Sequence, residues 1–310
     1  SVMLRGLCFC EFITFIDMKK FALILLIISV NLHGQKKVLD HKDFDIWNRI
    51  QNSQISSNGD FIMYSLQRGE EDSFLKIKDK NANLIFEHDR ADKGVFSYDS
   101  KYAIFVVKEW NDTITEMKRR KVKKGKMPMD SLGIFNLQNK TLVKISSIKS
   151  YENPEKWSGY LAYTYDSTNK HKKDTIKEKK INKKPSSKNG YPLIIRNLDT
   201  ETEDTIPFVL DYTFSKKEKF ISYVTSGEKN STKPGVYIKD LSNNTTKHIY
   251  ESHVKTKYHK LELSDSGKHL AFVVDTDSTK AYERNKELYT WNQKNDLKLI
   301  LDRKLSLIHI

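Results

Sequence analysis

Apolar and polar positions follow one short pattern that recurs along the chain. A tight polar turn leads into an apolar run, and the last position of the pattern is aromatic in every copy. The five copies are Gly59–Tyr64, Ser100–Phe105, Ser158–Tyr163, Glu218–Tyr223 and Gly267–Phe272. Short runs rich in β-branched and aromatic residues between polar turns are typical of β-hairpins rather than helices.

The spacing of the copies indicates a repeat. The aromatic positions are separated by 41, 58, 60 and 49 residues, and the two longest intervals contain Lys-rich segments at 115–130 and 168–190. Without these segments the two intervals shorten to 42 and 37 residues, so the underlying period is about 40. We therefore expect one structural unit every 40 residues or so, with insertions in two of them.

A second β-rich run lies within each period. These runs are Phe74–Asp79, Gly133–Leu137, Leu193–Leu198, Val236–Leu241 and Leu288–Trp291. A further strand usually follows, such as Leu142–Ile145 or Leu297–Leu301. Three or four strands in about 40 residues predict a β-propeller blade. The strands of a β-sandwich would not recur with a fixed period, and solenoid repeats are usually shorter or helical.

The predicted fold class is therefore an all-β propeller with about five blades present in an incomplete ring. The apolar run after each turn is expected to be an inner or central strand, buried between neighbouring blades. Before the first blade, Phe44, Ile46, Trp47 and Ile50 fit either a short amphipathic helix or a leading strand.

Composition narrows the class further. Of 310 residues, 38% are hydrophobic and 11% aromatic, which suffices for a core, and a mean hydropathy of -0.63 excludes a polytopic membrane protein. The two cysteines, Cys8 and Cys10, are too close for an ordinary disulfide or a four-ligand zinc site. From Lys19 onward there is no cysteine, so thiol nucleophiles and CxxC redox motifs are excluded for that part of the chain.

The N-terminus has the pattern of a signal peptide. Met18–Lys20 is a charged start, Phe21–Val30 is apolar but too short to span a membrane, and the predicted signal segment ends at Gly34. A periplasmic or secreted location follows, with a membrane anchor as the alternative because His33 is unusual near a cleavage site. Residues 1–17 precede this start and are interpreted as upstream, non-native sequence.

The net charge of +14 is concentrated in two places. Residues 115–130 carry +5 and residues 168–190 carry +7, so the remaining chain is almost neutral. The segments contain two arginines, Arg119 and Arg120, and no aromatic residue, since Tyr191 lies just outside. Base stacking needs aromatic side chains, which are missing from both segments. Base-edge recognition relies on arginines, of which there are only two, so nucleic acid is not expected as a partner. We expect solvated hairpin insertions that project from the disc, with a salt-dependent contact to an anionic surface or polyanion as the alternative.

Three segments resemble a known family. Leu39–Trp47, the turn Ile55–Asp60, and the Lys-rich stretch running into Met127–Leu132 resemble the N-terminal half of secreted bacterial serine peptidases of the prolyl oligopeptidase family, which includes dipeptidyl peptidase IV and the acylaminoacyl peptidases. The resemblance spans roughly residues 36–303. It implies a seven- or eight-bladed propeller that limits which peptides reach a C-terminal α/β-hydrolase domain carrying Ser, Asp and His.

The sequence lacks the catalytic features of that family. None of the 310 residues belongs to a G-x-S-x-G nucleophile elbow, and the alternating strands and helices of a hydrolase domain are absent. We therefore expect an incomplete front portion: a signal peptide at 18–34, a partial propeller at 35–303, and a truncated or non-native tail at 304–310. Exposed blade faces would then cause poor solubility or aggregation.

The expected function is that of a substrate-gating propeller of a serine peptidase. Peptide substrates would be hydrolysed by the missing catalytic domain, without a cofactor, without nucleic acid and without stable membrane insertion after signal cleavage; homo-oligomerisation stays open. The alternative is a stand-alone periplasmic propeller that binds a protein or polysaccharide, resembling the propellers of Tol-type envelope proteins.

Single residues add no assigned catalytic, cofactor-binding or metal site. The nine histidines lack ligand spacing, and His253 and His259, six apart, are expected on the surface or in turns. His269 stands where other copies have an aromatic residue, so we expect it in the core. Glu70–Asp72 invites comparison with the glutamate pair that holds a substrate's amino terminus in dipeptidyl peptidases, but a solvated turn is the favoured interpretation.

Overall fold

The computed structural model divides the chain into two units, Ser1–Ile46 and Trp47–Ile310. The structure describes residues 40, 43, 47–69, 71–166, 183–228, 231–252, 256–276, 286–294 and 296–302. In the first unit, the Asp43 carboxylate accepts the backbone N–H of Asp40 at 2.8 Å. The predicted signal peptide, most of the second Lys-rich segment and the predicted tail at 304–310 lie outside the described residues.

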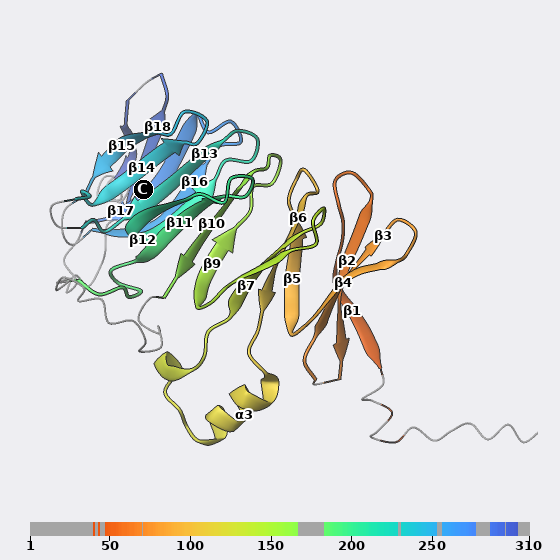
Figure 1. Ribbon diagram of the computed structural model, residues 1–310. Coiled ribbons are helices and arrows are strands. Elements are labelled where there is room, and N and C mark those ends of the chain that lie inside the picture. Colours follow the sequence, from red (N-terminus) through yellow and green to blue (C-terminus); the bar gives the residue numbers. More distant parts are fainter. Residues whose placement is uncertain are drawn as a thin grey trace, which may run out of the picture. The chain divides into compact units, whose positions relative to one another are not determined.

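The described part of the second unit is built of antiparallel sheets in which consecutive strands pair (Figure 1). The first sheet contains β1 (Asn48–Ile55), β2 (Phe61–Arg68), β3 (Phe74–Asp79) and β4 (Leu84–Asp89). The second contains β5 (Ala91–Phe96), β6 (Tyr102–Val107), β7 (Ser131–Asn136) and β8 (Leu142–Ile145). The last contains β16 (Lys257–Leu263), β17 (His269–Asp275), β18 (Glu287–Asn292) and β19 (Lys298–Asp302).

The middle sheet is two blades joined by one strand. It contains β9 (Ile148–Glu152), β10 (Tyr160–Tyr165), β11 (Tyr191–Asn197), β12 (Glu203–Phe214), β13 (Phe220–Thr225), β14 (Gly235–Asp240) and β15 (Thr245–Glu251). The first part of β12 pairs with β11, and the second part, beyond an irregularity between Val209 and Asp211, pairs with β13. One long strand thus serves as the outer strand of blade 3 (β9–β12) and the inner strand of blade 4 (β12–β15). The described residues therefore form five four-stranded blades, with β1–β4 as blade 1, β5–β8 as blade 2 and β16–β19 as blade 5.

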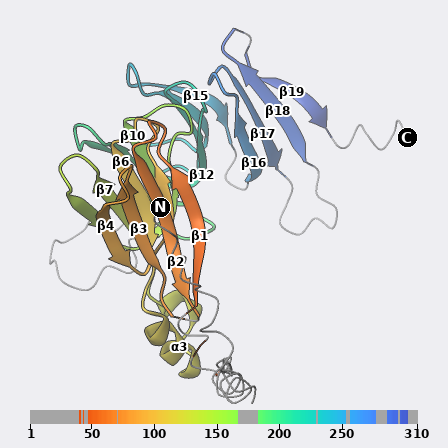
Figure 2. The ribbon, with the colours of Figure 1, turned by 90° about the vertical axis from the view of Figure 1, so that its right-hand side faces the viewer.

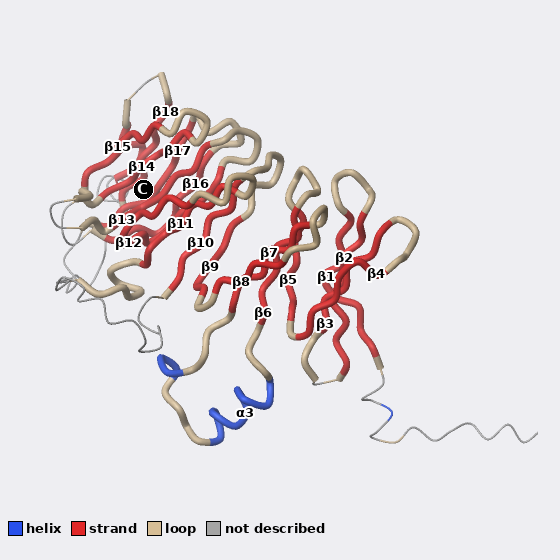
Figure 3. The backbone as a smooth tube through the Cα atoms, in the orientation of Figure 1, coloured by secondary structure: helices blue, strands red, loops and turns tan. Residues whose placement is uncertain are grey.

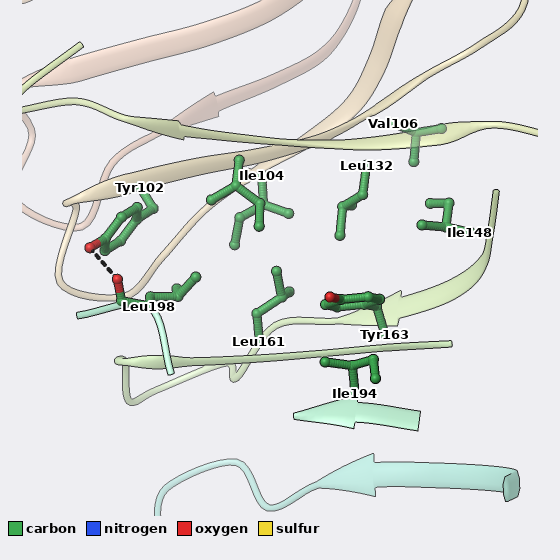
Figure 4. Packing of buried hydrophobic residues seen from close by; sticks show 10 residues of the cluster. Tyr102, Ile104, Val106, Leu132, Ile148, Leu161, Tyr163, Ile194 and Leu198 are labelled. Atoms are coloured by element: carbon green, nitrogen blue, oxygen red, sulfur yellow. Dashed lines mark hydrogen bonds between the residues drawn. The ribbon is translucent and has the colours of Figure 1, made fainter. Parts of the chain in front are cut away.

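Four hydrophobic clusters lie between consecutive blades. Met63, Leu75 and Ile77 of blade 1 pack with Phe105 of blade 2, and blade 2 contributes Ile104 to the next cluster. Figure 4 shows Ile104 and Leu132 of blade 2 opposite Leu161 and Tyr163 of blade 3. The remaining two clusters join blade 3 to blade 4 and blade 4 to blade 5. Blades that bury both faces against their neighbours are the packing of a β-propeller, as the sequence predicted.

The sequence repeat corresponds to the second strand of each blade. Its aromatic end, Phe105 in blade 2, faces the preceding blade, because alternate side chains of a strand point to opposite faces. Its first residue, Tyr102 in the same blade, faces the following blade. The Tyr102 hydroxyl donates to the Leu198 carbonyl of blade 3 at 2.7 Å, drawn as the dashed line in Figure 4, and Tyr160 donates likewise to Leu241 of blade 4 at 3.2 Å.

A serine closes the turn before this strand in four of the blades. In blade 2, Ser97 donates its backbone N–H to the Tyr102 carbonyl, and its hydroxyl accepts the Tyr102 N–H at 3.0 Å. Ser56 makes the same pair of contacts with Phe61 in blade 1. Ser215 and Ser264 occupy the same backbone position in blades 4 and 5. The recurring turn is therefore held by a specific side chain, a role that the polar pattern alone did not identify.

The blades at the two ends of the series differ from those between them. Ile62 is 41% exposed, whereas the equivalent Leu161 is buried, because no described blade precedes the first one. For the same reason the prediction for His269 is wrong: it points away from blade 4, no described blade follows, and its side chain is exposed. Of the four residues for which a short helix or a leading strand was expected, Ile50 lies in β1 and Trp47 immediately precedes it, while Phe44 and Ile46 lie outside the described residues.

The first insertion is partly helical, which the loop prediction missed. Helix α3 (Asn111–Arg119) and a 3-10 turn at Lys124–Lys126 lie beyond the ends of β6 and β7 (Figure 3). Asp112 in the first turn and Lys118 and Arg119 in the last turn suit the helix dipole, and Arg120 pairs with Glu116 at 2.7 Å. None of the described helices is long and apolar enough to cross a membrane.

Candidate functional site

A cleft of about 410 Å³ lies where the first insertion leaves the blades. The connection between β2 and β3, the start of blade 2 and both ends of the insertion contribute to it. Its lining is polar and charged: Gln67, Glu71, Asp72, Ser73, Arg90, Lys108, Glu109, Asn111, Ile114 and Asp130. The β2–β3 connection, the start of blade 2 and the first insertion thus line one charged cleft.

Arg90 is the anchor of this cleft. It connects blade 1 to blade 2, and its guanidinium lies 3.4 Å from the Asp89 carboxylate and 3.6 Å from that of Glu109. The same group donates to the Lys108 carbonyl at 3.2 Å and lies 4.3 Å from the centre of the Trp110 ring. These contacts hold the start of the insertion against the connection between the two blades.

A second ion pair fixes Lys108, the other cation that lines the cleft. Lys108 Nζ contacts the Asp92 carboxylate at 2.7 Å, and the Asn52 side-chain amide donates to the same carboxylate at 2.6 Å. Burial alone would raise the pKa of Asp92, but the hydrogen bonds from Lys108, the Lys93 backbone and Asn52 hold it below its ordinary value. The carboxylate therefore stays ionised and ties β1 of blade 1 to the insertion.

The acidic side of the cleft includes the segment singled out in the sequence. Asp72 Oδ1 accepts the backbone N–H of Asn111 at 3.1 Å, so this residue braces the start of α3. Glu71 also lines the cleft, while Glu70 lies outside the described residues. Asp130 is exposed at the rim of the cleft. Glu71 is exposed, as expected of a solvated turn, whereas Asp72 is partly buried where it contacts Asn111.

The charged and polar side chains of this cleft can bind a polar or charged ligand. Among its described lining residues there is no histidine or cysteine, and the one hydroxyl, that of Ser73, donates to the Ala91 carbonyl at 3.2 Å. In the described part of the chain no three His, Cys, Asp or Glu side chains are grouped to hold a metal ion.

The histidines are scattered over the blades. His259 lies 3.6 Å from the buried Asp275, and His253 is outside the described residues. His88 is buried in β4 beside Phe105 of blade 2. His248 stacks on Tyr237 with ring centres 4.3 Å apart. His88 and His248 are thus packed against aromatic rings, whereas His259 is exposed.

A second charged contact lies where the second Lys-rich segment returns to blade 3. Lys183 Nζ donates to the Ser226 carbonyl at 2.9 Å, the Ser226 hydroxyl at 2.7 Å and the Gly227 carbonyl at 2.8 Å, and lies 4.6 Å from the Phe208 ring centre. Burial lowers the pKa of Lys183. These three contacts hold the end of the second Lys-rich segment against residues 226 and 227.

Comparison with known proteins gives similarity in solved structures only. The chain is similar to the β-propeller domain of the trilobed protease from Pyrococcus furiosus, at 12% identity and a TM-score of 0.43, over 83% of this chain and 72% of that chain. It is similar to a prolyl endopeptidase at 11% identity and a TM-score of 0.46, over 92% of this chain and 42% of that chain. It is also similar to TolB from Acinetobacter baumannii at 11% identity and a TM-score of 0.36, over 83% of this chain and 55% of that chain.

No model of a known protein family matches the chain, and no curated protein matches it. The solved structures similar to it include propeller domains of prolyl oligopeptidase-type peptidases, as the sequence resemblance led us to expect. The chain spans less than half the length of the prolyl endopeptidase. At these identities and TM-scores the similarities assign no activity, and the blade architecture stands on the sheets and clusters described above.

Proposed function

We propose that these blades are the substrate-gating propeller of an exported serine peptidase of the prolyl oligopeptidase type. The observation that carries the proposal is the resemblance of Leu39–Trp47, Ile55–Asp60 and Met127–Leu132 to that family, combined with the blade architecture. Export rests on the sequence pattern of residues 18–34 alone.

The packing of the blades and the position of the charged cleft support a gating role. The blades form rigid, face-packed units, and functional segments are commonly carried on the loops of such scaffolds. The charged cleft and the first insertion lie at the same end of blade 2, where β6 ends and β7 begins. In this proposal acyl transfer is performed by a Ser–His–Asp set on a separate hydrolase domain, and the blades control which peptides reach it.

The first test is to read the coding sequence beyond Ile310. A strand followed by G-x-S-x-G, then Asp and His in that order, is expected. A stop after further blades, with no hydrolase segment, would contradict the proposal and leave a stand-alone binding propeller.

The second test addresses gating itself. The full-length protein and its hydrolase segment alone are given fluorogenic peptides of increasing length and a folded protein substrate. We expect the full-length protein to cleave short peptides only, and the separate hydrolase segment to lose that size limit. Equal size dependence in both would contradict a gating role while leaving the peptidase assignment intact.

A further inference from the structure

The two Lys-rich segments leave the propeller at the same end. The first connects β6 to β7, the second and third strands of blade 2, and the second connects β10 to β11, the second and third strands of blade 3. Neighbouring blades repeat the same strand directions, so both connections are on one side. Most of the second segment lies outside the described residues, and the inference below rests on the first.

The opposite end of the blades has a different charge. Its turns join first to second strands and third to fourth strands, and their nine lysines nearly balance eight acidic residues. Several of these charges pair with each other, such as Lys101 with Asp199 at 3.3 Å and Lys216 with Glu155 at 3.5 Å. The excess positive charge of the described blades is therefore concentrated at the insertion end.

The cations of the first insertion are exposed and mostly unpaired. Seven Lys or Arg lie between residues 118 and 126, all with exposed side chains, and neither α3 nor the following 3-10 turn buries any residue. Arg120 pairs with Glu116, whereas none of the other six pairs with a carboxylate among the described residues. Figure 2 shows α3 beyond the ends of the strands, so these side chains can approach an external surface together.

The residue types favour a particular kind of anion. Five of the seven cations are lysines, which bind phosphates as point charges rather than through the planar fork that reads base edges. Residues 111–130 contain no aromatic side chain on which bases could stack. Ile114, Met117 and Val122 are only partly buried beside the cations, so the insertion also offers apolar atoms at its surface. Basic residues with nearby apolar groups suit the surface of an anionic bilayer.

We propose that the first insertion, residues 111–130, docks the propeller onto an anionic, phosphate-bearing lipid surface. The contact is peripheral and electrostatic, and it requires neither a spanning helix nor the peptidase activity proposed above. Because it is driven by charge, it weakens as salt shortens the Debye length from about 10 Å at 0.1 M to about 3 Å at 1 M.

The test is vesicle co-sedimentation of the full chain. The vesicles contain either phosphatidylcholine alone or phosphatidylcholine mixed with phosphatidylglycerol. The insertion variant combines Lys121→Gln, Lys123→Gln, Lys124→Gln and Lys126→Gln. The matched control combines Lys140→Gln, Lys219→Gln, Lys268→Gln and Lys294→Gln, four exposed lysines in turns at the opposite end. Both variants remove the same net charge, and circular dichroism checks that both fold.

We expect the natural chain to bind only the phosphatidylglycerol vesicles, in a salt-sensitive way. The insertion variant should lose at least about tenfold in affinity, and the control should stay within about twofold of the natural chain. Absence of binding by the natural chain, or an equal loss in both variants, would overturn the proposal. Tighter, insertion-dependent binding to heparin or to a single-stranded oligonucleotide than to the vesicles would also overturn it, in favour of a soluble polyanion.

Discussion

The inner blades and the first blade carry the same sequence pattern in different surroundings. Phe105 of blade 2 is fully buried against blade 1, while the equivalent Tyr64 of blade 1 is only partly buried and its neighbour Ile62 is 41% exposed. The residues are similar in kind, so the difference comes from the neighbouring blade and not from the strand itself. The repeat thus places apolar side chains on both faces of the strand, and each face is stabilised only where another blade covers it.

The largest expected effect is a direct test of this difference. Phe105→Ala should lower the free energy of unfolding by about 3–5 kcal/mol, because it empties a closed cluster. Tyr64→Ala should cost roughly 1 kcal/mol, since that side chain is already partly in water. Urea unfolding of both variants measures this, and equal losses would mean that the two faces are equally covered.

Overpacking the same cluster should have the next largest effect. A Cβ at position 133 would overlap the Phe105 ring, so Gly133→Ala must displace the ring and should cost about 1–3 kcal/mol. Gly125→Ala in the insertion is the control, because a Cβ there meets nothing within 4 Å. A Gly133→Ala protein as stable as the Gly125→Ala protein would show that the cluster is loose.

Removing one hydrogen bond between blades should have a smaller effect. Tyr102→Phe deletes the donor to the Leu198 carbonyl and should cost about 1 kcal/mol. Tyr98→Phe is the matched change at a residue that is 49% exposed, and it should be close to neutral. If thermal unfolding gives the same shift for both, the hydroxyl contact between blades 2 and 3 does not contribute.

The smallest effect concerns pH. Burial raises the pKa of Glu152 above its ordinary value of 4.5, although the Phe214 N–H and the Thr213 hydroxyl donate to its carboxylate. Between 4.5 and the raised pKa the folded chain binds more protons than the unfolded chain, so the free energy of unfolding falls as pH rises through this window.

Glu152→Gln keeps an acceptor for both donors and cannot ionise. The stability of the variant relative to the natural chain should therefore increase as pH rises above 4.5, and then level off. Unfolding midpoints measured across this range, for both proteins, provide the test. A constant difference would show that Glu152 titrates alike in the folded and unfolded chain.

The sequence predicted the repeated strands well because their alternation and aromatic ends record burial on two faces. It could not predict that β12 serves two blades, since pairing on both sides of one strand leaves no local signal. The helix in the first insertion was missed because none of its residues is buried, so its sequence carries no apolar face that faces a core. His269 was misplaced because its repeat position is apolar only where a following blade covers it.

The candidate site could likewise be predicted only in part from the sequence. Charge and composition identified the Lys-rich insertion and the Glu70–Asp72 turn separately. Their meeting at Arg90 and Asn111 depends on contacts between residues that are 18 and 39 positions apart, which no local pattern records. Lys183 looked like one of many solvated lysines, and only the fold shows that three oxygens of residues 226 and 227 surround its ammonium.

The most direct measurement is a set of double-mutant cycles on the two faces of blade 2. Ile104 should couple to Leu161 of blade 3, and Phe105 to Met63 of blade 1, each by at least about 0.5 kcal/mol, since each pair shares one cluster. Ile104 and Met63, which belong to different clusters, should be additive. Coupling between Ile104 and Met63, with additivity in the other two pairs, would contradict the assignment of alternate repeat positions to opposite neighbouring blades.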